Sequence, residues 1–445
     1  MRIQLSDHFT YRKIIRFVIP SILMMIFTSC YSIVDGLFIS NFVGTTAFAA
    51  VNLIYPVVMV VSGFGFVIGT GGSAVVAITM GEGQEKEANQ YFSLLICFSI
   101  LIGVLGCGIG QLVLRPVAIL LGASGQLLSD CLVYCRIILA AVPCFMLQVA
   151  FHTFFSTAEK PKYGLYMTVG AGIINVVLDF VFVGVLKWGL AGAAIATAIS
   201  QMFGGLAPVY YFLRANNSSR LRIVKPIFRM WVLTKTVTNG ISEFLSSISS
   251  SFILLLYNHQ LMVYAGTDGV AAYGVIEYVF FIFFSVFSGY AMGSAPVISF
   301  HYGAQNTEEL QNLFKKSLKL IMTASVTMLA LSQVFARPLS AIFVSYDADL
   351  LDMTVRGFRI YAGCYLMCGM GVFGSSFFTA LGNGLISAII SFFRTVVFDA
   401  SAVMLLPLIW GLDGVWAATI VSEGLALILT VWFEVTQNKK YHYWK

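Results

Sequence analysis

The chain has 445 residues, of which 59% are apolar and only 10% are charged, and its mean hydropathy is +0.88. Soluble globular proteins carry about 25% charged residues, so this chain cannot cover a water-exposed surface and is expected to lie in a lipid bilayer. The net charge of +6 is small and requires no polyanionic partner. The composition therefore excludes most soluble enzymes, and no nucleic acid is expected as a partner.

Twelve apolar runs follow one another along the chain, each long enough to cross a bilayer, which takes about 20 helical residues. They cover residues 14–39, 48–78, 91–114, 131–157, 164–186, 190–213, 234–264, 270–300, 316–340, 356–381, 385–410 and 414–436. Strands of a membrane barrel would be about ten residues long and alternate in polarity, whereas these runs are longer and apolar on every face. The sequence thus predicts an all-α integral membrane protein with twelve transmembrane helices.

The lysines and arginines predict the orientation of these helices, because they accumulate on the cytoplasmic side of a membrane. If the N-terminus is cytoplasmic, 20 of the 26 lie at the inner ends of the runs and 6 at the outer ends. We therefore expect both termini in the cytoplasm and the protein in the cell (inner) membrane.

The second half of the chain repeats the first at one constant offset, which carries Gly44 onto Gly266. The same offset carries Glu87 onto Glu309, Arg115 onto Arg337, Trp188 onto Trp410 and Thr197 onto Thr419. Six spans per repeat give both halves the same orientation, and parallel repeats of this kind are typical of transporters. The expected domains are a six-helix lobe over residues 1–213, a basic cytoplasmic linker over 214–229, and a second lobe over 230–445.

Carboxylates inside a membrane are costly, about 2.5 to 3.5 kcal/mol at the centre of a span, and mark functional sites. Asp35, Asp179 and Thr197 are expected about 9, 12 and 10 Å below the outer surface, at about 1.5 Å per residue. Asn175 shares the helical face of Asp179, and Tyr31 lies one turn from Asp35. The set could share a proton, bind Na⁺ through Asp35, Asn175, Asp179 and Thr197, or tie three helices together as a structural cluster.

The second half repeats this pattern imperfectly. Thr419 matches Thr197, but Tyr257 falls at the position of Asp35, and Asp399 lies two residues from the equivalent of Asp179. We therefore expect the coupling chemistry in the first half. Arg394 precedes Asp399 by five residues, and the two could form either a structural or a functional pair.

Other candidates are single residues. Glu243 could lie at the inner mouth of the seventh run, and Glu434 is expected in solvent. The residues that could line a cavity are Glu277, Asp399, His152 and Glu243. Pro20 lies in the first run, where it permits a bend or simply begins the helix.

Several motifs are absent from the sequence. It has no phosphate-binding GxxxxGK[ST] loop and no HExxH metal motif, so neither ATP hydrolysis nor an enzymatic reaction is indicated. The eight cysteines lie mostly within apolar runs and are interpreted as small apolar packing residues. No cofactor or structural metal is expected.

The chain as a whole resembles the MATE (multidrug and toxic compound extrusion) family, in particular its prokaryotic DinF-like branch. The resemblance rests on the twelve spans in two halves and on three stretches: Pro20 to Gly44 with Tyr31 and Asp35, Asn175 to Asp179, and Gly189 to Thr197.

The resemblance implies a V-shaped fold and secondary active export driven by inward H⁺ or Na⁺. It implies that Asp35 and Asp179 titrate or bind the cation, that Asn175 and Thr197 assist and Tyr31 donates a hydrogen bond, and that bending of the first helix centres on Pro20. The NorM-like branch has a glutamate deep in the seventh span, where this chain has serines at 246–247 and 249–251, so a sodium site of that kind is not expected.

The function expected from these observations is export of lipophilic, mostly cationic small molecules by alternating access, performed by a monomer. The alternative is a flippase for lipid-linked oligosaccharides or lipids, which is disfavoured because the spans contain few arginines and lysines to hold a pyrophosphate. A receptor or channel is disfavoured by the internal repeat.

Overall fold

The computed structural model describes residues 3–214 and 219–444, so residues 215–218 of the predicted linker lie outside the described part. All regular elements of the described residues are helices. The first half consists of α1 (Tyr11–Phe38), α2 (Thr45–Phe66), α3 (Gly72–Gly81), α4 (Glu85–Leu120), α5 (Gly125–Thr157), α6 (Pro161–Asp179) and α7 (Gly189–Leu213).

The second half begins with a helix of 74 residues, α8 (Met230–Gly303). It continues through α9 (Thr307–Val344), α10 (Ala348–Tyr361), α11 (Tyr365–Ala380), α12 (Gly384–Phe392), α13 (Asp399–Leu405), α14 (Pro407–Trp410) and α15 (Leu412–Tyr441). The predicted domain boundaries fall where α7 ends and α8 begins; that each half behaves as a unit stays a prediction.

Eleven helical segments of the described chain are long and apolar enough to cross a membrane. At 1.5 Å per residue α8 would be about 110 Å long, far more than the hydrocarbon core of about 30 Å. It is broken at Gly266, whose φ of 62° and ψ of −148° are not helical. It therefore supplies two spans, and the predicted twelve are confirmed.

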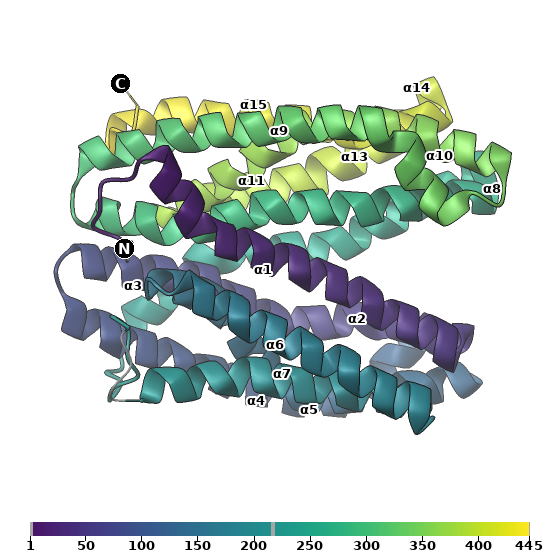
Figure 1. Cartoon of the computed structure of the whole chain (residues 1–445), viewed down its shortest axis with the longest axis horizontal. Helices are drawn as coiled ribbons and strands as arrows, with labels where there is room; N and C mark the ends of the chain where they lie inside the picture. Colours follow the sequence, from purple (N-terminus) through teal and green to yellow (C-terminus); the bar gives the residue numbers. More distant parts are fainter. Residues whose placement is uncertain (1–2, 215–218, 445) are drawn as a thin grey trace.

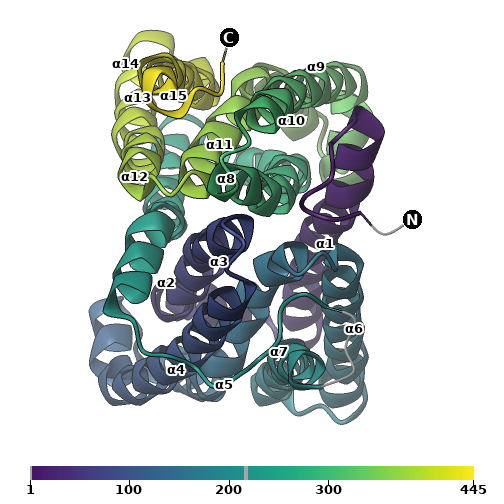
Figure 2. The same cartoon turned by 90° about the vertical axis from the view of Figure 1, so that its left-hand side faces the viewer.

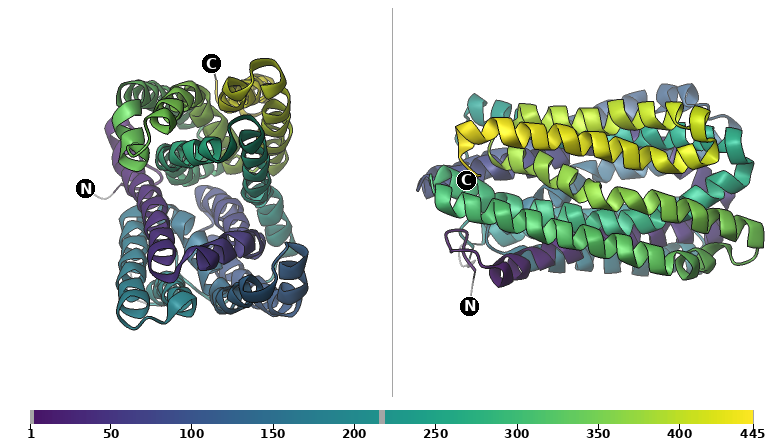
Figure 3. Two further views of the ribbon diagram at one scale, coloured as in Figure 1. Left: turned by 90° about the vertical axis from the view of Figure 1, so that its right-hand side faces the viewer. Right: turned by 90° about the horizontal axis from the view of Figure 1, so that it is seen from above.

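The helices gather into two groups that run the length of the molecule (Figure 1). In the end views α2–α7 lie in the lower group and α9–α15 in the upper one (Figures 2 and 3). Helix α1 crosses along one side, from beside the second half to the first, and both chain ends lie at the same end of the molecule (Figure 1).

The internal repeat is visible in the backbone. Gly189 and Gly411 correspond at the repeat offset and have φ angles of 59° and 57°, and each precedes the last span of its half. An L side chain is strained in this left-handed region, whereas glycine is not. In both halves, therefore, a glycine with positive φ ends the loop before the last span.

At the end that carries the termini the two halves touch through glycines. A Cβ added at Gly81 of α3 would collide with the carbonyl oxygen of Phe300, and one added at Gly303 with that of Ile78. These two contacts are related by the repeat offset. Small residues let helix backbones approach closely in a membrane, so the ends of α3 and α8 close this end of the molecule.

Candidate functional site

The first-half cluster joins three helices, as the sequence predicts. Asp35 comes from α1, Asn175 and Asp179 from α6, and Thr197 from α7. Nδ2 of Asn175 donates a hydrogen bond to Oγ1 of Thr197 at 3.3 Å, and the carboxyl groups of Asp35 and Asp179 are close enough to interact with each other. The structure therefore brings together residues from spans that are far apart in the chain.

The α6 residues of this cluster are buried, Asp35 and Thr197 are partly buried, and several of the cluster's oxygens have no protein donor. Asp179 is 0% exposed and Asn175 is 1% exposed. Both carboxyl oxygens of Asp179, Oδ1 of Asp35 and Oδ1 of Asn175 have no hydrogen-bond partner among the described residues. Burying an unpartnered carboxylate is strongly unfavourable. The oxygens thus fit a proton shared between the two acids, and their chemistry also fits a hard cation such as Na⁺.

Tyrosines surround this pair of carboxyl groups. Tyr31 of α1 lies against Gly172 of α6 and interacts electrostatically with Asp35. Tyr55 of α2 lies within electrostatic range of Tyr31, and Tyr134 of α5 within range of Asp35. Sequence reasoning missed Tyr55 and Tyr134. The sequence could have indicated Tyr55, because it corresponds to the acid Glu277 at the repeat offset, but it offers no such indication for Tyr134.

Segments of π-helix lie next to the candidate carboxylates. One (η3, Phe180–Val185) begins directly after Asp179, and another (η5, Phe393–Phe398) ends directly before Asp399. Such segments are rare and frequently occur at functional sites, because the extra residue in the turn directs side chains differently. Each half therefore departs from regular helix next to a candidate carboxylate of its fifth span, after Asp179 in the first half and before Asp399 in the second.

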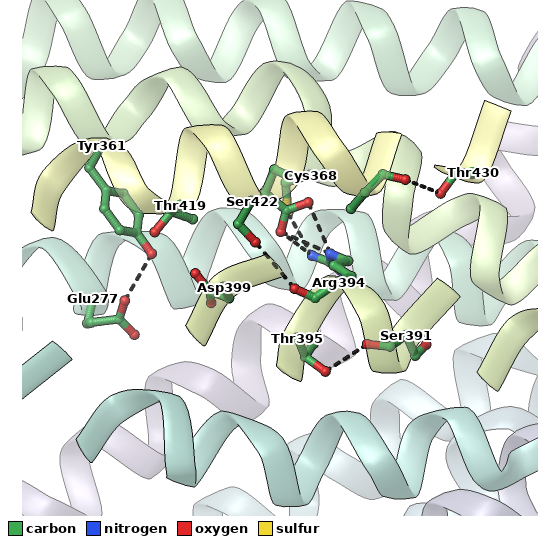
Figure 4. Close-up of polar contacts among 12 residues, drawn as sticks. Glu277, Tyr361, Cys368, Ser391, Arg394, Thr395, Asp399, Thr419, Ser422 and Thr430 are labelled. Carbon is green, nitrogen blue, oxygen red and sulfur yellow. Dashed lines mark hydrogen bonds and ion pairs between the residues drawn. The ribbon is translucent and has the colours of Figure 1, made fainter. Parts of the chain in front are cut away.

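The second half contains a matching polar cluster. The hydroxyl group of Tyr257 donates to Oδ1 of Asp399 at 3.0 Å and lies 2.7 Å from Oγ1 of Thr419. Nearby, the hydroxyl group of Tyr361 donates to Oε1 of Glu277 at 3.1 Å (Figure 4). In contrast to the first half, these acids have tyrosine donors as direct partners.

The tyrosines and acids are exchanged between the halves. At the repeat offset Asp35 corresponds to Tyr257, and Tyr55 corresponds to Glu277. In each half one acid and one tyrosine thus occupy the same two places in opposite order. The first half is left with two acids near each other, and the second with acids held by hydroxyl groups.

Arg394 does not pair with Asp399, so that prediction is wrong. Its Nε lies 2.9 and 3.0 Å from the two carboxyl oxygens of Glu423, and its Nη2 lies 3.4 Å from Sγ of Cys368 (Figure 4). Five residues correspond to about 140° around a regular helix, and Arg394 lies in η5, so its side chain points to α15 and α11. A buried charge requires such a partner.

The remaining single candidates are dispersed. Pro20 is the tenth residue of α1, so it is interior and does not begin the helix. Glu243 is half-buried in α8 and interacts electrostatically with Arg394. His152 is buried, 3.3 Å from the hydroxyl group of Thr168, beside a pocket of about 10 Å³.

Glu434 is 2% exposed, so the prediction that it lies in solvent is wrong. The chain beyond α15 folds back over this residue, and the hydroxyl group of Tyr443 donates to the backbone carbonyl of Glu434 at 2.6 Å.

Comparison with known proteins identifies the family. The MatE family model matches twice, at residues 20–181 and 241–402. The chain belongs to the MatE family. The two matches are displaced from each other by almost the same distance along the chain as the two halves of the internal repeat. The first contains Asp35 and Asp179, and the second contains Glu277 and Asp399.

Among curated MatE relatives, the multidrug export protein MepA of Staphylococcus saprophyticus is 22% identical over 95% of this chain and 91% of the relative. MepA of Staphylococcus aureus strain MSSA476 is 21% identical over 94% of this chain and 92% of the relative. A solved multidrug resistance MATE transporter in an outward-facing conformation superimposes with a TM-score of 0.91 at 22% identity, covering 97% of both chains. The predicted fold class is thus confirmed.

Proposed function

We propose that the protein is a secondary active antiporter that exports lipophilic, mostly cationic compounds from the cell in exchange for inward H⁺. The observation that carries this proposal is the pair Asp35 and Asp179, of which Asp179 is fully and Asp35 partly buried, and whose oxygens the protein leaves without sufficient donors. The names of the MepA relatives support multidrug export as the overall activity.

The coupling ion is proposed to be H⁺ because two neighbouring buried carboxyl groups cannot both ionise at low cost, so one of them retains a proton. Protonation and deprotonation of the pair would change how tightly α1 is held to α6. The hydrogen bond between Asn175 of α6 and Thr197 of α7 holds the two helices together beside the pair of carboxyl groups. Na⁺ at the same oxygens is the alternative that the experiment distinguishes.

Alternating access would convert this local change into transport. Helix α1 contacts both α6 of the first half and α8 of the second, and it carries the interior Pro20, which removes one backbone hydrogen bond and permits bending. A proton on Asp35 could therefore alter the course of the helix that lies between the halves. Both termini are proposed to be cytoplasmic, in the plasma membrane, and the unit to be a monomer.

The flippase alternative is weakened by the ion pairs. A pyrophosphate needs free arginines or lysines, but Arg394 is bound by Glu423, and Arg356 Nε lies 3.0 Å from Oδ1 of Asp413. Arg394 and Arg356 thus already have carboxylate partners.

The test is ethidium movement in proteoliposomes that contain only this protein, with a pH gradient or a Na⁺ gradient imposed separately. We expect movement under the pH gradient and its loss in Asp35→Asn and in Asp179→Asn. Glu308→Gln, an exposed change, serves as the control and should transport normally. Movement under Na⁺ alone would replace H⁺ by Na⁺, and no movement under either would refute the proposal in favour of lipid-linked substrates.

A further inference from the structure

Residues 3–10, which we call the N-terminal strap, lie on the second half although they precede the first span of the first half. The backbone N–H of Phe9 donates to Oε1 of Glu309 at 2.8 Å, and Nδ1 of His8 lies 2.6 Å from Oε2 of the same residue. The carbonyl of Phe9 accepts from Asn312 at 3.0 Å and from Lys316 at 2.7 Å. The strap is thus bound to the first turns of α9.

The strap also contributes buried apolar side chains to this contact. Phe9 is 1% exposed and Leu5 is 0% exposed, and the ring of Phe9 packs edge-on against His301 near the end of α8, at 6.3 Å between ring centroids. Glu309 itself is only 5% exposed. A buried carboxylate that accepts from two residues of another segment holds that segment in one position.

Residues 219–229, which we call the linker strap, form the reciprocal contact with the first half. The backbone N–H of Arg222 donates to Oδ1 of Asn89 at 2.6 Å, and that of Val224 donates to Oγ of Ser93 at 2.8 Å. Arg220 forms an ion pair with Glu85. The linker strap therefore lies on the first turns of α4, across which the chain runs before α8 begins (Figure 2).

The two straps occupy corresponding places in the repeat. Helices α4 and α9 begin at Glu85 and Thr307, which correspond at the repeat offset, and each is the third span of its half. Each strap precedes the first span of one half and binds the third span of the other half. Exchanged segments of this kind connect the two halves, and their side chains Leu5, Phe9 and Leu221 are buried against them.

Glu159, in the turn between α5 and α6, joins the two straps. Its Oε1 accepts from the backbone N–H of Leu5 in the N-terminal strap and from Nη1 of Arg220 in the linker strap, both at 3.0 Å. The guanidinium group of Arg220 also lies 5.8 Å from the ring centroid of Phe300 in α8. One carboxylate of the first half thus receives donors from both straps, beside the end of the second half.

We propose that the N-terminal strap and the linker strap form a latch that holds the two halves closed at the end carrying the termini and must release before that end can open. The latch lies beside the glycine contacts between α3 and α8, because Arg220 lies over the ring of Phe300 and Phe9 packs against His301. These glycine contacts are the ones that opening would separate. Its carboxylates Glu309 and Glu159 are buried, but its hydrogen bonds and ion pairs also have exposed members, since His8 is 67% and Glu85 58% exposed in their side chains. Water can replace such partners, so the latch can release.

The inference rests on the alternating access of the proposed function. The first test locks the latch with a disulfide in His8→Cys combined with Glu309→Cys, in the full chain. We expect oxidation to stop ethidium export and reduction to restore it, whereas His8→Cys alone, treated in the same way, should export throughout. Export by the oxidised double variant at the rate of the reduced one would overturn the latch.

The second test does not depend on transport and therefore separates failure of the latch from failure of the proposed function. Hydrogen exchange is compared in Glu309→Gln and in the matched control Glu308→Gln, one residue away and exposed. We expect at least tenfold faster exchange in Glu309→Gln, both in residues 5–10 and in the facing ends of α3 and α8. Faster exchange confined to the strap, or equal exchange in both variants, would show that the strap does not hold the halves together.

Discussion

The ion pair between Arg394 and Glu423 permits a quantitative prediction, because both side chains are buried within the second half. Their side chains are 13% and 8% exposed, and Nη2 of Arg394 lies 2.8 Å from Oε1 of Glu423. Removing one member of a buried pair leaves an uncompensated charge and typically destabilises a protein by about 3–5 kcal/mol. Glu423→Gln keeps the size of the side chain and removes only the charge.

We therefore expect Glu423→Gln to destabilise the protein by about 3 kcal/mol, at the lower end of that range, because the amide oxygen still accepts one hydrogen bond and Cys368 remains near the guanidinium group. The double variant Arg394→Met with Glu423→Leu replaces both charges by apolar groups. Such replacements of a whole buried pair are often neutral or stabilising, so it should be more stable than Glu423→Gln.

The assay is thermal unfolding of the purified variants in one detergent, followed by tryptophan fluorescence. Glu308→Gln is the control for loss of a carboxylate, since Glu308 is exposed, and it should unfold with the wild type. If Glu423→Gln unfolded at the wild-type temperature, or if the double variant unfolded below Glu423→Gln, the pair would not be a buried, mutually dependent unit.

Three further predictions concern packing and backbone. Tyr257→Phe removes the hydroxyl group that bridges Asp399 and Thr419 and should cost about 1–3 kcal/mol, because buried acceptors lose their donor; unchanged thermal stability would contradict the cluster. Gly303→Leu should lower stability more than Tyr257→Phe does, because the side chain would meet the backbone of α3; normal stability would mean that the ends of α3 and α8 are not in contact. Gly411→Ala should lower the free energy of unfolding by about 1 kcal/mol, because φ is 57° at this residue. Its control is Gly108→Ala within α4, where an added Cβ would meet nothing within 4 Å, so stability should be unchanged or higher. Equal effects of the two substitutions would refute the argument from φ.

Much of the candidate site could be predicted because a membrane restricts polar residues so strongly. An acid in an apolar run is conspicuous, and its depth follows from the helical rise. This reasoning selects Asp35, Asn175, Asp179 and Thr197, which the structure brings together. The role of the cluster in coupling stays a proposal that the transport experiment tests.

The errors arise where a partner has to be chosen between helices. Proximity in sequence pairs Arg394 with Asp399, whereas the structure pairs it with Glu423 across two helices. A position near a helix end predicts that Glu434 lies in solvent, but residues after α15 fold over it. The number of residues between two positions does not show how a helix is rotated about its axis, nor where the chain runs beyond the end of a helix.

The amino-acid sequence by itself determined the twelve spans, the two-fold repetition and the positions of the acids within the spans. In lipid every backbone polar group must be bonded internally, and runs this long and apolar on every face can do so only as helices. The tertiary structure alone decided which polar side chains meet, that tyrosine and acid exchange places between the halves, and that each strap binds the opposite half. These contacts join residues up to 307 positions apart. They depend on helix rotation and lobe packing, which local composition and periodicity do not encode.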